Sequence, residues 1–330
     1  MATITNRGET KMGFETAYGD GQKTNTSLIS RALSTTMEGF VEKIETGIRR
    51  KGLANELNST VAGNTGGTVV LEGNLHYEDN ILLNQVLLSS FLDGITAGKE
   101  YRIRDVQGWN GTTNVAISSS AIYEMMPDVD ATACNIALGS TMESLVITGE
   151  SGGLIKYTAN YRSKSVVKGS AETFIGAAPT ILTDNCFNYA LFAFTGGSHT
   201  TAINSPLNFT LTITNIFADD SINHKNSASK LQDLVIGTTV MLDVTLQKLA
   251  TDYSEFDALI LDDTAKEFTL TLTNGDGDEW AITLKGKVVT TTDAPDNNNI
   301  ITTTLNIEGG SNRDDTDEVF AFLCELTPHA

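Results

Sequence analysis

Hydrophobic and polar positions alternate along several segments of the chain with the two-residue period of a half-buried β-strand. The segment 67–78 places its larger apolar side chains on one face, namely Val69, Leu71, Leu75 and Tyr77. Later segments alternate in the same way with threonine on the polar face, namely residues 208–215, 237–249 and 299–310. Because valine, isoleucine and threonine favour strands, the pattern predicts a mainly β fold.

One segment, residues 79–94, has the apolar spacing of a helix instead. Asp79 or Asn80 can cap its start, and Gly94 fits the position just after its end. Its apolar stripe consists of Ile81, Leu82, Val86, Leu88, Phe91 and Leu92. The sequence therefore predicts one helix that follows the first strand and flanks a sheet.

Two pairs of alternating segments are joined by glycine-rich turns and predict β-hairpins, at residues 144–161 and 268–284. The second turn, Asn274 to Glu279, also carries oxygen-bearing side chains at the first, third and fifth positions of a calcium loop. Glu279 stands where that loop needs glycine, and Lys285 stands where it needs a bidentate glutamate. Since both flanks alternate as strands, the residues favour a hairpin tip over a metal site.

The order strand, helix, hairpin, strand occurs twice if residues 254–263 form a short helix. Val69 and Val240 are 171 positions apart, as are Leu71 and Leu242, whereas the hairpins are about 123 apart. An internal duplication explains this order, and chance similarity of threonine-rich strands is the alternative. The predicted organisation is an N-terminal arm (1–60), a first β domain (61–220) with insertions at about 95–142 and 164–206, and a second β domain (221–330).

The composition limits the classes of function. A net charge of -19 argues against polyanion binding through a basic surface. No apolar run is long enough to cross a bilayer, and residues 1–13 lack the apolar region of a secretory signal. Cys134, Cys186 and Cys324 are odd in number and widely spaced, so we expect small buried hydrophobes rather than disulfides or a zinc site.

The sequence gives little support for any catalytic residue, and it predicts no enzyme and no cofactor. Ser151 lies in a G-x-S-x-G pattern, but a strand follows it where a nucleophile elbow needs a helix. The four histidines have no ligand spacing, and His76 is expected to be solvated on the polar face of a strand. Adjacent carboxylates such as Asp262 and Asp263 are expected on the surface of so acidic a chain.

Three blocks of the sequence resemble the tail tube proteins (major tail proteins) of non-contractile bacteriophages, the siphophages. Residues 13–19, GFETAYG, resemble the family's E-T-x-Y-G entry, which the basic segment GIRRKG (47–52) follows. Residues 66–88, GGTVVLEGNLHYEDNILLNQVLL, resemble its strand-and-helix block. The strand-turn-strand FTLTLTNGDGDEWAITLKGKVV (268–289) is similar to its C-terminal hairpin.

The resemblance implies a β-sandwich or barrel with a flanking helix, assembled into rings that stack into a hollow tube. Genomic DNA would pass through the channel at infection, and a tape-measure protein would occupy it beforehand. The implied partners are other copies of the chain, the tail terminator and the tail tip proteins, with no membrane. The implied location is the virion tail, assembled in the host cytoplasm.

An acidic, hydroxyl-rich channel wall would repel phosphate rather than bind it. The predicted wall residues are Glu72, Asn74, His76 and Glu78 in one strand and Asp243, Thr245 and Gln247 in the other. The alternative is that both faces meet outer solvent. Inter-ring contacts are predicted between a basic and an acidic segment, with Arg49, Arg50 and Lys51 facing Asp314, Asp315 and Asp317.

The number of chains in a ring depends on whether both halves of the predicted duplication line the channel. Three chains make a pseudo-sixfold ring if both halves line the channel, and six chains are needed if only one half does. The competing function is a binding module, either a capsid decoration or a glycan-binding β-sandwich. Such a module would need clustered surface aromatic residues, and Trp109 and Trp280 are isolated in the sequence.

Overall fold

The part of the chain that the structure describes is mainly β, with antiparallel strands joined into one large sheet, a separate two-stranded pair and one short α-helix. The structure is a computed structural model. It describes residues 9–15, 23–27, 32–45, 50–51, 54–55, 60–86, 99–102, 119–125, 133–150, 152–170, 186–188, 193–196, 199–204, 207–217, 235–247, 266–295, 301–309 and 322–327. Among these residues no helix is long and apolar enough to span a membrane.

Eight strands lie side by side in the largest part of the sheet, which we call the main sheet. In spatial order they are β3 (Ala32–Glu45), β6 (Thr60–Asn74), β10 (Lys156–Ser163), β9 (Ala133–Glu150), β14 (Asn208–Phe217), β15 (Val235–Gln247), β18 (Ile301–Gly309) and β17 (Glu279–Pro295). All these pairings are antiparallel, so each strand alternates between one buried and one more exposed face.

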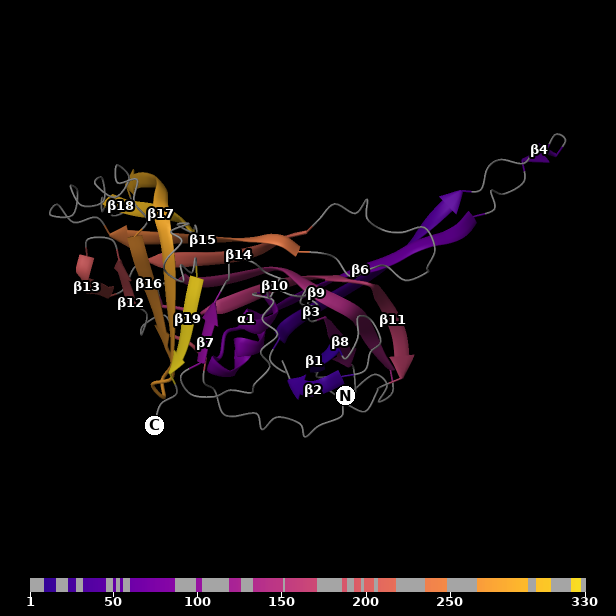
Figure 1. Cartoon of the computed structure of the whole chain (residues 1–330), viewed down its shortest axis with the longest axis horizontal. Coiled ribbons are helices and arrows are strands. Elements are labelled where there is room, and N and C mark those ends of the chain that lie inside the picture. Colours follow the sequence, from indigo (N-terminus) through magenta and orange to yellow (C-terminus); the bar gives the residue numbers. More distant parts are fainter. Residues whose placement is uncertain are drawn as a thin grey trace, which may run out of the picture.

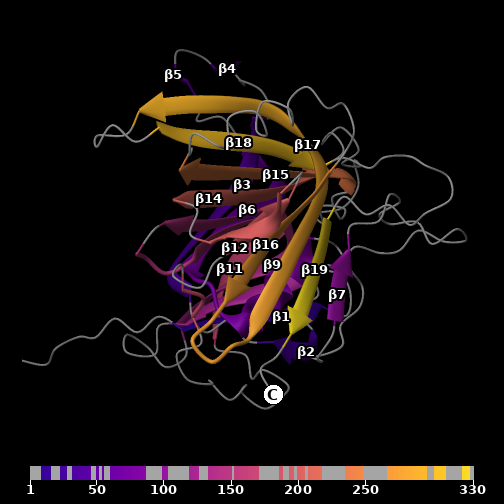
Figure 2. The ribbon, with the colours of Figure 1, turned by 90° about the vertical axis from the view of Figure 1, so that its left-hand side faces the viewer.

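Two long strands bend out of the main sheet and carry the rest of the fold. The first part of β9, up to Ser140, pairs with β8 (Ser120–Met125) on one side and with β11 (Ser165–Ser170) on the other. β8 also pairs with β1 (Glu9–Glu15). β1 also pairs with β2 (Lys23–Ser27). The first part of β17 pairs with β16 (Lys266–Thr273) and β19 (Phe322–Thr327). Figure 2 shows β17 turning from its place beside β18 to run beside β16 and β19.

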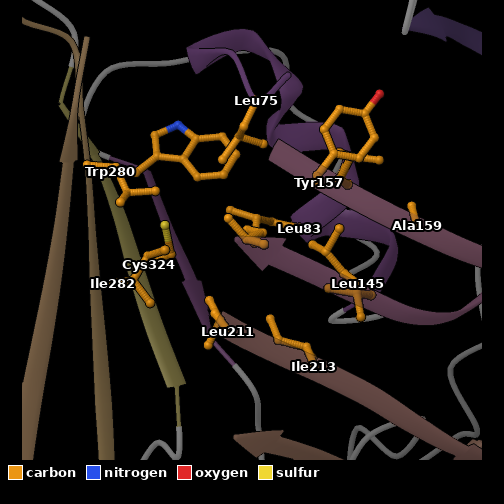
Figure 3. Packing of buried hydrophobic residues seen from close by; sticks show 14 of the residues in the cluster. Leu75, Leu83, Leu145, Tyr157, Ala159, Leu211, Ile213, Trp280, Ile282 and Cys324 are labelled. Atoms are coloured by element: carbon orange, nitrogen blue, oxygen red, sulfur yellow. The ribbon is translucent and has the colours of Figure 1, made fainter. Parts of the chain in front are cut away.

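The edges of this second region are β13 (His199–Asn204), which pairs with β12 (Ala193–Gly196) beside β16, and β7 (Lys99–Arg102), which pairs with β19. We call β13, β12, β16, the first part of β17, β19 and β7 the C-terminal region. It packs across the apolar face of the main sheet, as the view in Figure 3 shows. The buried space between them holds Trp280 and Ile282 on one side and Leu145, Leu211 and Ile213 on the other.

A single hydrophobic cluster contains residues from both predicted domains and from the predicted arm, from Met12 to Leu326. The predicted boundary at residue 220 falls between β14 and β15, which are neighbours in the main sheet. The predicted insertions also contribute to the sheet, because part of 95–142 forms β7, β8 and the start of β9, while part of 164–206 forms β11, β12 and β13.

The predicted helix begins where expected, as α1 (Asn80–Val86), directly after the 3-10 helix η1 (Tyr77–Asp79). The predicted remainder, residues 87–94, lies outside the described residues, as does the predicted short helix at 254–263. Ile81, Leu82, Leu83 and Val86 are buried in the main cluster, and α1 packs against β9 and β14. The sequence thus located the helix start correctly, together with the stripe residues Ile81, Leu82 and Val86; the predicted stripe residues Leu88, Phe91 and Leu92 lie outside the described residues.

Both hairpin predictions are confirmed, as the pairs β9–β10 and β16–β17. At the second turn the Asn274 side-chain oxygen accepts hydrogen bonds from the backbone N–H groups of Asp276 and Asp278, at 3.0 and 2.8 Å. Its side-chain nitrogen donates to Asp278 Oδ2 at 2.8 Å, and Gly277 has a φ of 93°. These side chains therefore satisfy and shape the turn itself, as asparagine and glycine do in tight turns.

The predicted N-terminal arm divides into two parts. Residues 9–15 belong to the body, because Met12 and Phe14 of β1 are buried in the main cluster, so the arm prediction does not hold for them. β3 and β6 instead form a long hairpin that extends beyond the rest of the ribbon in Figure 1. The short strands β4 (Arg50–Lys51) and β5 (Ala54–Asn55) pair at its far end, which we call the hairpin tip.

Two glycines face each other across β3 and β6 at the point where this hairpin leaves the rest of the fold, and β11 packs against them there. Gly39 of β3 pairs with Gly67 of β6, and Val166 of β11 packs against both. A Cβ atom added at Gly67 would lie 2.5 Å from a Val166 methyl carbon and 2.8 Å from the Glu38 carbonyl oxygen. Only glycine allows β11 to cross the hairpin this closely, so the contact fixes how the hairpin leaves the body.

The strand pairing gives the predicted duplication no support. In the first half β6 lies beside β10 of the hairpin, and β14 lies beside β9. In the second half β15 lies beside β18, and β18 lies beside β17, with β16 in the C-terminal region. The same sequence order therefore produces two different pairing orders.

Candidate functional surface

The face of the main sheet that points away from the hydrophobic core is polar across all eight strands. The pairing register arranges its side chains in rows that cross the sheet. One row runs Ser34, Glu72, Thr158, Val146, Thr212, Met241, Glu308 and Lys287. The next runs Asn74, Lys156, Thr148, Thr210, Asp243, Asn306 and Thr290. We call this surface the polar face.

Five of the predicted wall residues lie on the polar face. These are Glu72 and Asn74 on β6 and Asp243, Thr245 and Gln247 on β15. The register places Asn74 and Asp243 in the same row, four strand spacings apart, which is about 19 Å. Two segments far apart in the sequence therefore contribute to one continuous surface.

The other two predicted wall residues leave this surface, because β6 ends at Asn74. His76 is 6% exposed, so the prediction that it is solvated is wrong. Its ring nitrogens contact Asp79 and Cys186 instead of water. Glu78 lies in η1 and is half-buried. The two-residue alternation continues to Glu78 in the sequence, but the chain has already turned into a helix there.

Carboxylates outnumber cations on the described part of the polar face. The acidic members are Glu38, Glu72, Glu143, Glu150, Asp243 and Glu308, and the basic members are Lys156, Arg162 and Lys287. Arg162 Nε lies 3.5 Å from Glu143 Oε1, and Lys287 is directly opposite Glu308. Pairing with acidic neighbours reduces the positive potential of these cations, so the face remains acidic in character.

Hydroxyl and amide groups on the polar face bind one another across the strands. Ser34 Oγ donates to Glu72 Oε2 at 3.0 Å, and the hydroxyls of Thr245 and Thr304 lie 2.9 Å apart. Asn306 Nδ2 donates to Asp243 Oδ1. Cross-strand pairs of this kind stabilise a sheet and hold its side chains in place. The result is a mostly polar surface in which several hydroxyl and amide side chains are hydrogen-bonded to one another, with Met241 as an exposed apolar side chain.

The sequence prediction missed most of this surface, because it took the polar residues of β6 and β15 alone. Thr158, Thr148, Thr210, Thr212 and Asn306 lie between or beside those strands in the register. The alternating pattern of β14 was visible in the sequence, but the strand order that places β14 next to β15 was not. No local pattern specifies which alternating segments become neighbours.

The main sheet has two open edges among the described residues. β3 pairs with β6 on one side, and residues 287–295 of β17 pair with β18 on one side. Backbone N–H and C=O groups at an exposed edge are a template for pairing with another chain. A long twisted sheet with two such edges can be extended by a further copy at either end.

The predicted inter-ring residues fall partly within the structure. Arg50 and Lys51 form β4 at the hairpin tip, far along the hairpin from the body in Figure 1. Arg49 and the acidic residues Asp314, Asp315 and Asp317 lie outside the described residues. The structure therefore places the basic segment at an extremity of the molecule.

Comparison with known proteins adds no family assignment: no protein-family model matches the chain, and no curated protein matches its sequence.

Proposed function

We propose that the protein is the structural subunit of a bacteriophage tail tube, in which copies join side by side into rings that stack around a channel for DNA. The observation that carries the proposal is the polar face, which is continuous across eight strands and ends at two open sheet edges. Such a sheet needs a neighbour at each edge, and closure of a ring supplies both.

Ring closure would place the polar face on the channel wall. Pairing of the β3 edge of one copy with residues 287–295 of the next would continue the sheet without a break. The wall would then carry more carboxylates than cations, among hydroxyls, amides and the exposed Met241. Because DNA phosphates bind to basic surfaces through counterion release, a wall of this composition offers passing DNA little affinity.

The number of strands favours three copies in a ring. Eight strands from each of three chains, at a spacing of about 4.8 Å, give a backbone circle about 37 Å wide before strand tilt widens it. Six chains would give a circle of about 73 Å. The smaller circle is closer to the width of one DNA duplex with its side-chain lining. In this arrangement β6 and β15 of every copy would both line the channel.

The projecting hairpin suits contact between stacked rings. It carries Arg50 and Lys51 to a point where a neighbouring copy can be reached, and its root is fixed by β11. We propose that the tip meets the acidic segment around Asp314 and Asp315 of a copy in the next ring. The tape-measure protein would fill the channel before DNA passes, and terminator and tip proteins would cap the stack.

Electron microscopy of the purified protein tests the proposal directly. We expect rings or tubes with a central channel and threefold symmetry in averaged end views, because the open edges of the main sheet pair between copies. Analytical ultracentrifugation should show assembly that increases with protein concentration. A monomer that persists at high concentration, with no rings on the grids, would contradict the tail-tube function.

Charge reversal at the hairpin tip should weaken stacking. The variant Arg50→Glu with Lys51→Glu is expected to raise the concentration needed for tube formation by up to about tenfold, since each exposed ion pair contributes about 0.2–1 kcal/mol. Added salt should weaken wild-type stacking in the same direction. Turbidity and negative-stain images at a series of concentrations measure both effects.

A reciprocal variant provides the control for this contact. Asp314→Lys with Asp315→Lys should weaken stacking alone and restore it when combined with the reversed tip. Recovery in the combined variant identifies the pair of segments, because charge alone does not distinguish partners. Stacking that is unaffected by tip reversal and by salt would exclude an electrostatic role for the tip.

A further inference from the structure

A cysteine, a histidine and an aspartate form a hydrogen-bonded chain just beyond the end of β6. Cys186 Sγ lies 2.9 Å from His76 Nε2, and His76 Nδ1 lies 3.3 Å from Asp79 Oδ2. The same carboxylate oxygen accepts a hydrogen bond from the His76 backbone N–H at 2.9 Å. His76 and Asp79 are buried, whereas Cys186 is half-buried. The histidine is thus held between a buried carboxylate and the thiol of a half-buried cysteine.

The backbone builds this arrangement by bringing together four parts of the chain that are distant in the sequence. Residues 186–188 form single bridges to His76, to Leu154 and to Asn274. Phe187 N–H donates to the Leu75 carbonyl at 2.9 Å, and Phe187 O accepts from Ile155 N–H at 3.0 Å. The Phe187 ring also packs edge-on against Trp280, with centroids 5.3 Å apart. Cys186 therefore sits on a segment whose position is fixed by its neighbours.

We propose that Cys186 is a nucleophilic thiol activated by His76, with Asp79 as a positioning residue, and that small disulfides are its substrates. His76 Nε2 accepts the Sγ proton, and the thiolate attacks one sulfur of the disulfide. A new S–S bond forms on Cys186 as the old S–S bond breaks. The departing thiolate takes a proton from His76, so one half of the disulfide leaves as a thiol and Cys186 is oxidised into a mixed disulfide with the other half.

The chemistry of the three groups fits this role better than metal binding. An imidazole beside a thiol can accept the thiol proton, and a carboxylate on the other ring nitrogen orients the imidazole for that transfer. Asp79 and Cys186 contact opposite nitrogens of the His76 ring, so they do not converge on one point. Among the described residues no group of three or more candidate ligands could hold a metal ion.

The other two cysteines provide internal controls. Cys134 and Cys324 are both buried. Burial, and secondarily the charge of Glu325, raises the pKa of the Cys324 thiol. A thiol that is buried and hard to ionise reacts slowly with disulfides. In the folded protein we therefore expect modification at Cys186 in preference to the other two positions.

The groups around His76 determine how its effect depends on pH. Asp79 faces it from η1, and Cys186 faces it from the bridging segment. Burial, and secondarily the charge of Asp79, raises the pKa of the Tyr157 hydroxyl on β10, so Tyr157 stays neutral. The charged group in contact with the histidine ring is therefore Asp79, and Tyr157 adds no charge near that carboxylate.

The test uses dithiodipyridine, a neutral disulfide whose released thione absorbs light, and mass spectrometry to locate the modified cysteine. At about pH 6 we expect Cys186 in the wild-type protein to react at least about tenfold faster than glutathione, because its gain in thiolate outweighs the loss of intrinsic nucleophilicity. The advantage should shrink at about pH 8.5, where an ordinary thiol ionises. Cys186→Ser should abolish the fast phase.

Two variants separate activation from structure. His76→Gln should remove the excess rate at about pH 6, and Asp79→Asn should reduce it while leaving the reaction at high pH nearly unchanged. Circular dichroism checks that both variants fold, and the wild-type pH profile needs no variant at all. A wild-type rate that follows glutathione at every pH, or a folded His76→Gln protein with the wild-type rate, would overturn the proposal.

Discussion

Replacing Trp280 with alanine is expected to lower the free energy of unfolding by about 3–5 kcal/mol, the range for loss of a fully buried tryptophan. Trp280 has no exposed surface and lies on the part of β17 that packs across the main sheet. Its ring meets Phe187 edge-on, and its Nε1 donates to the Tyr77 carbonyl at 3.2 Å. The side chain therefore joins the C-terminal region to the segment between β6 and α1.

Guanidinium unfolding followed by circular dichroism measures this effect, at a protein concentration low enough that assembly does not add stability. Trp280→Phe should lose less, because it keeps most of the packing and loses the hydrogen bond. Val289→Ala serves as the control, since Val289 is 49% exposed and should change stability by less than about 0.5 kcal/mol. A loss for Trp280→Ala as small as that of the control would show that the two layers are not held together here.

The elements of this fold could be predicted from the sequence because they depend on local patterns. The alternation from Val69 to Leu75 specified both the strand β6 and its buried face. The helical spacing after Asn80 specified the start of α1. Asparagine and glycine in the turn at Asn274 specified the hairpin of β16 and β17. Each of these signals lies within a few residues of the feature that it predicts.

The arrangement of those elements could not be predicted, because it depends on contacts between distant segments. β9 and β17 each bend and serve two parts of the sheet, which an alternating pattern does not reveal. Gly39 and Gly67 are adjacent only in the folded chain, where Val166 covers them. The His76–Cys186 contact spans 110 positions, so neither residue carried a recognisable motif.

The polar face could be predicted from the sequence only in part. Glu72 and Asp243 were identified from the alternation of their own strands, and the structure places both on one continuous surface. His76 and Glu78 were assigned to that surface by extending the same alternation past Asn74, where the strand ends. The limit of the prediction was therefore the strand boundary, which the capping interactions of Asp79 decide.

Lysine at two acidic positions of the polar face, Glu72 and Asp243, should slow the passage of DNA through assembled tails. Under the proposed function, Glu72→Lys with Asp243→Lys replaces repulsion by attraction at a point on each wall strand, and the substitution repeats in every copy of every ring. We expect release from virions carrying the variant to slow at least about tenfold at low salt, with recovery as salt rises, because phosphate binding depends steeply on ionic strength. The time course of DNA release, followed with a DNA-binding dye, measures it.

Glu267→Lys with Glu325→Lys is the matched control, because it changes the net charge equally at exposed positions on β16 and β19 in the C-terminal region. Both variants should form tubes of normal appearance. If the polar face lines the channel, the control variant should nevertheless release DNA at the wild-type rate, whereas the Glu72 and Asp243 variant should release it more slowly. Equal slowing in the two variants would assign the effect to overall charge rather than to the wall. Unchanged release in the Glu72 and Asp243 variant at low salt would place the polar face outside the channel, since a basic wall cannot pass a polyanion without binding it.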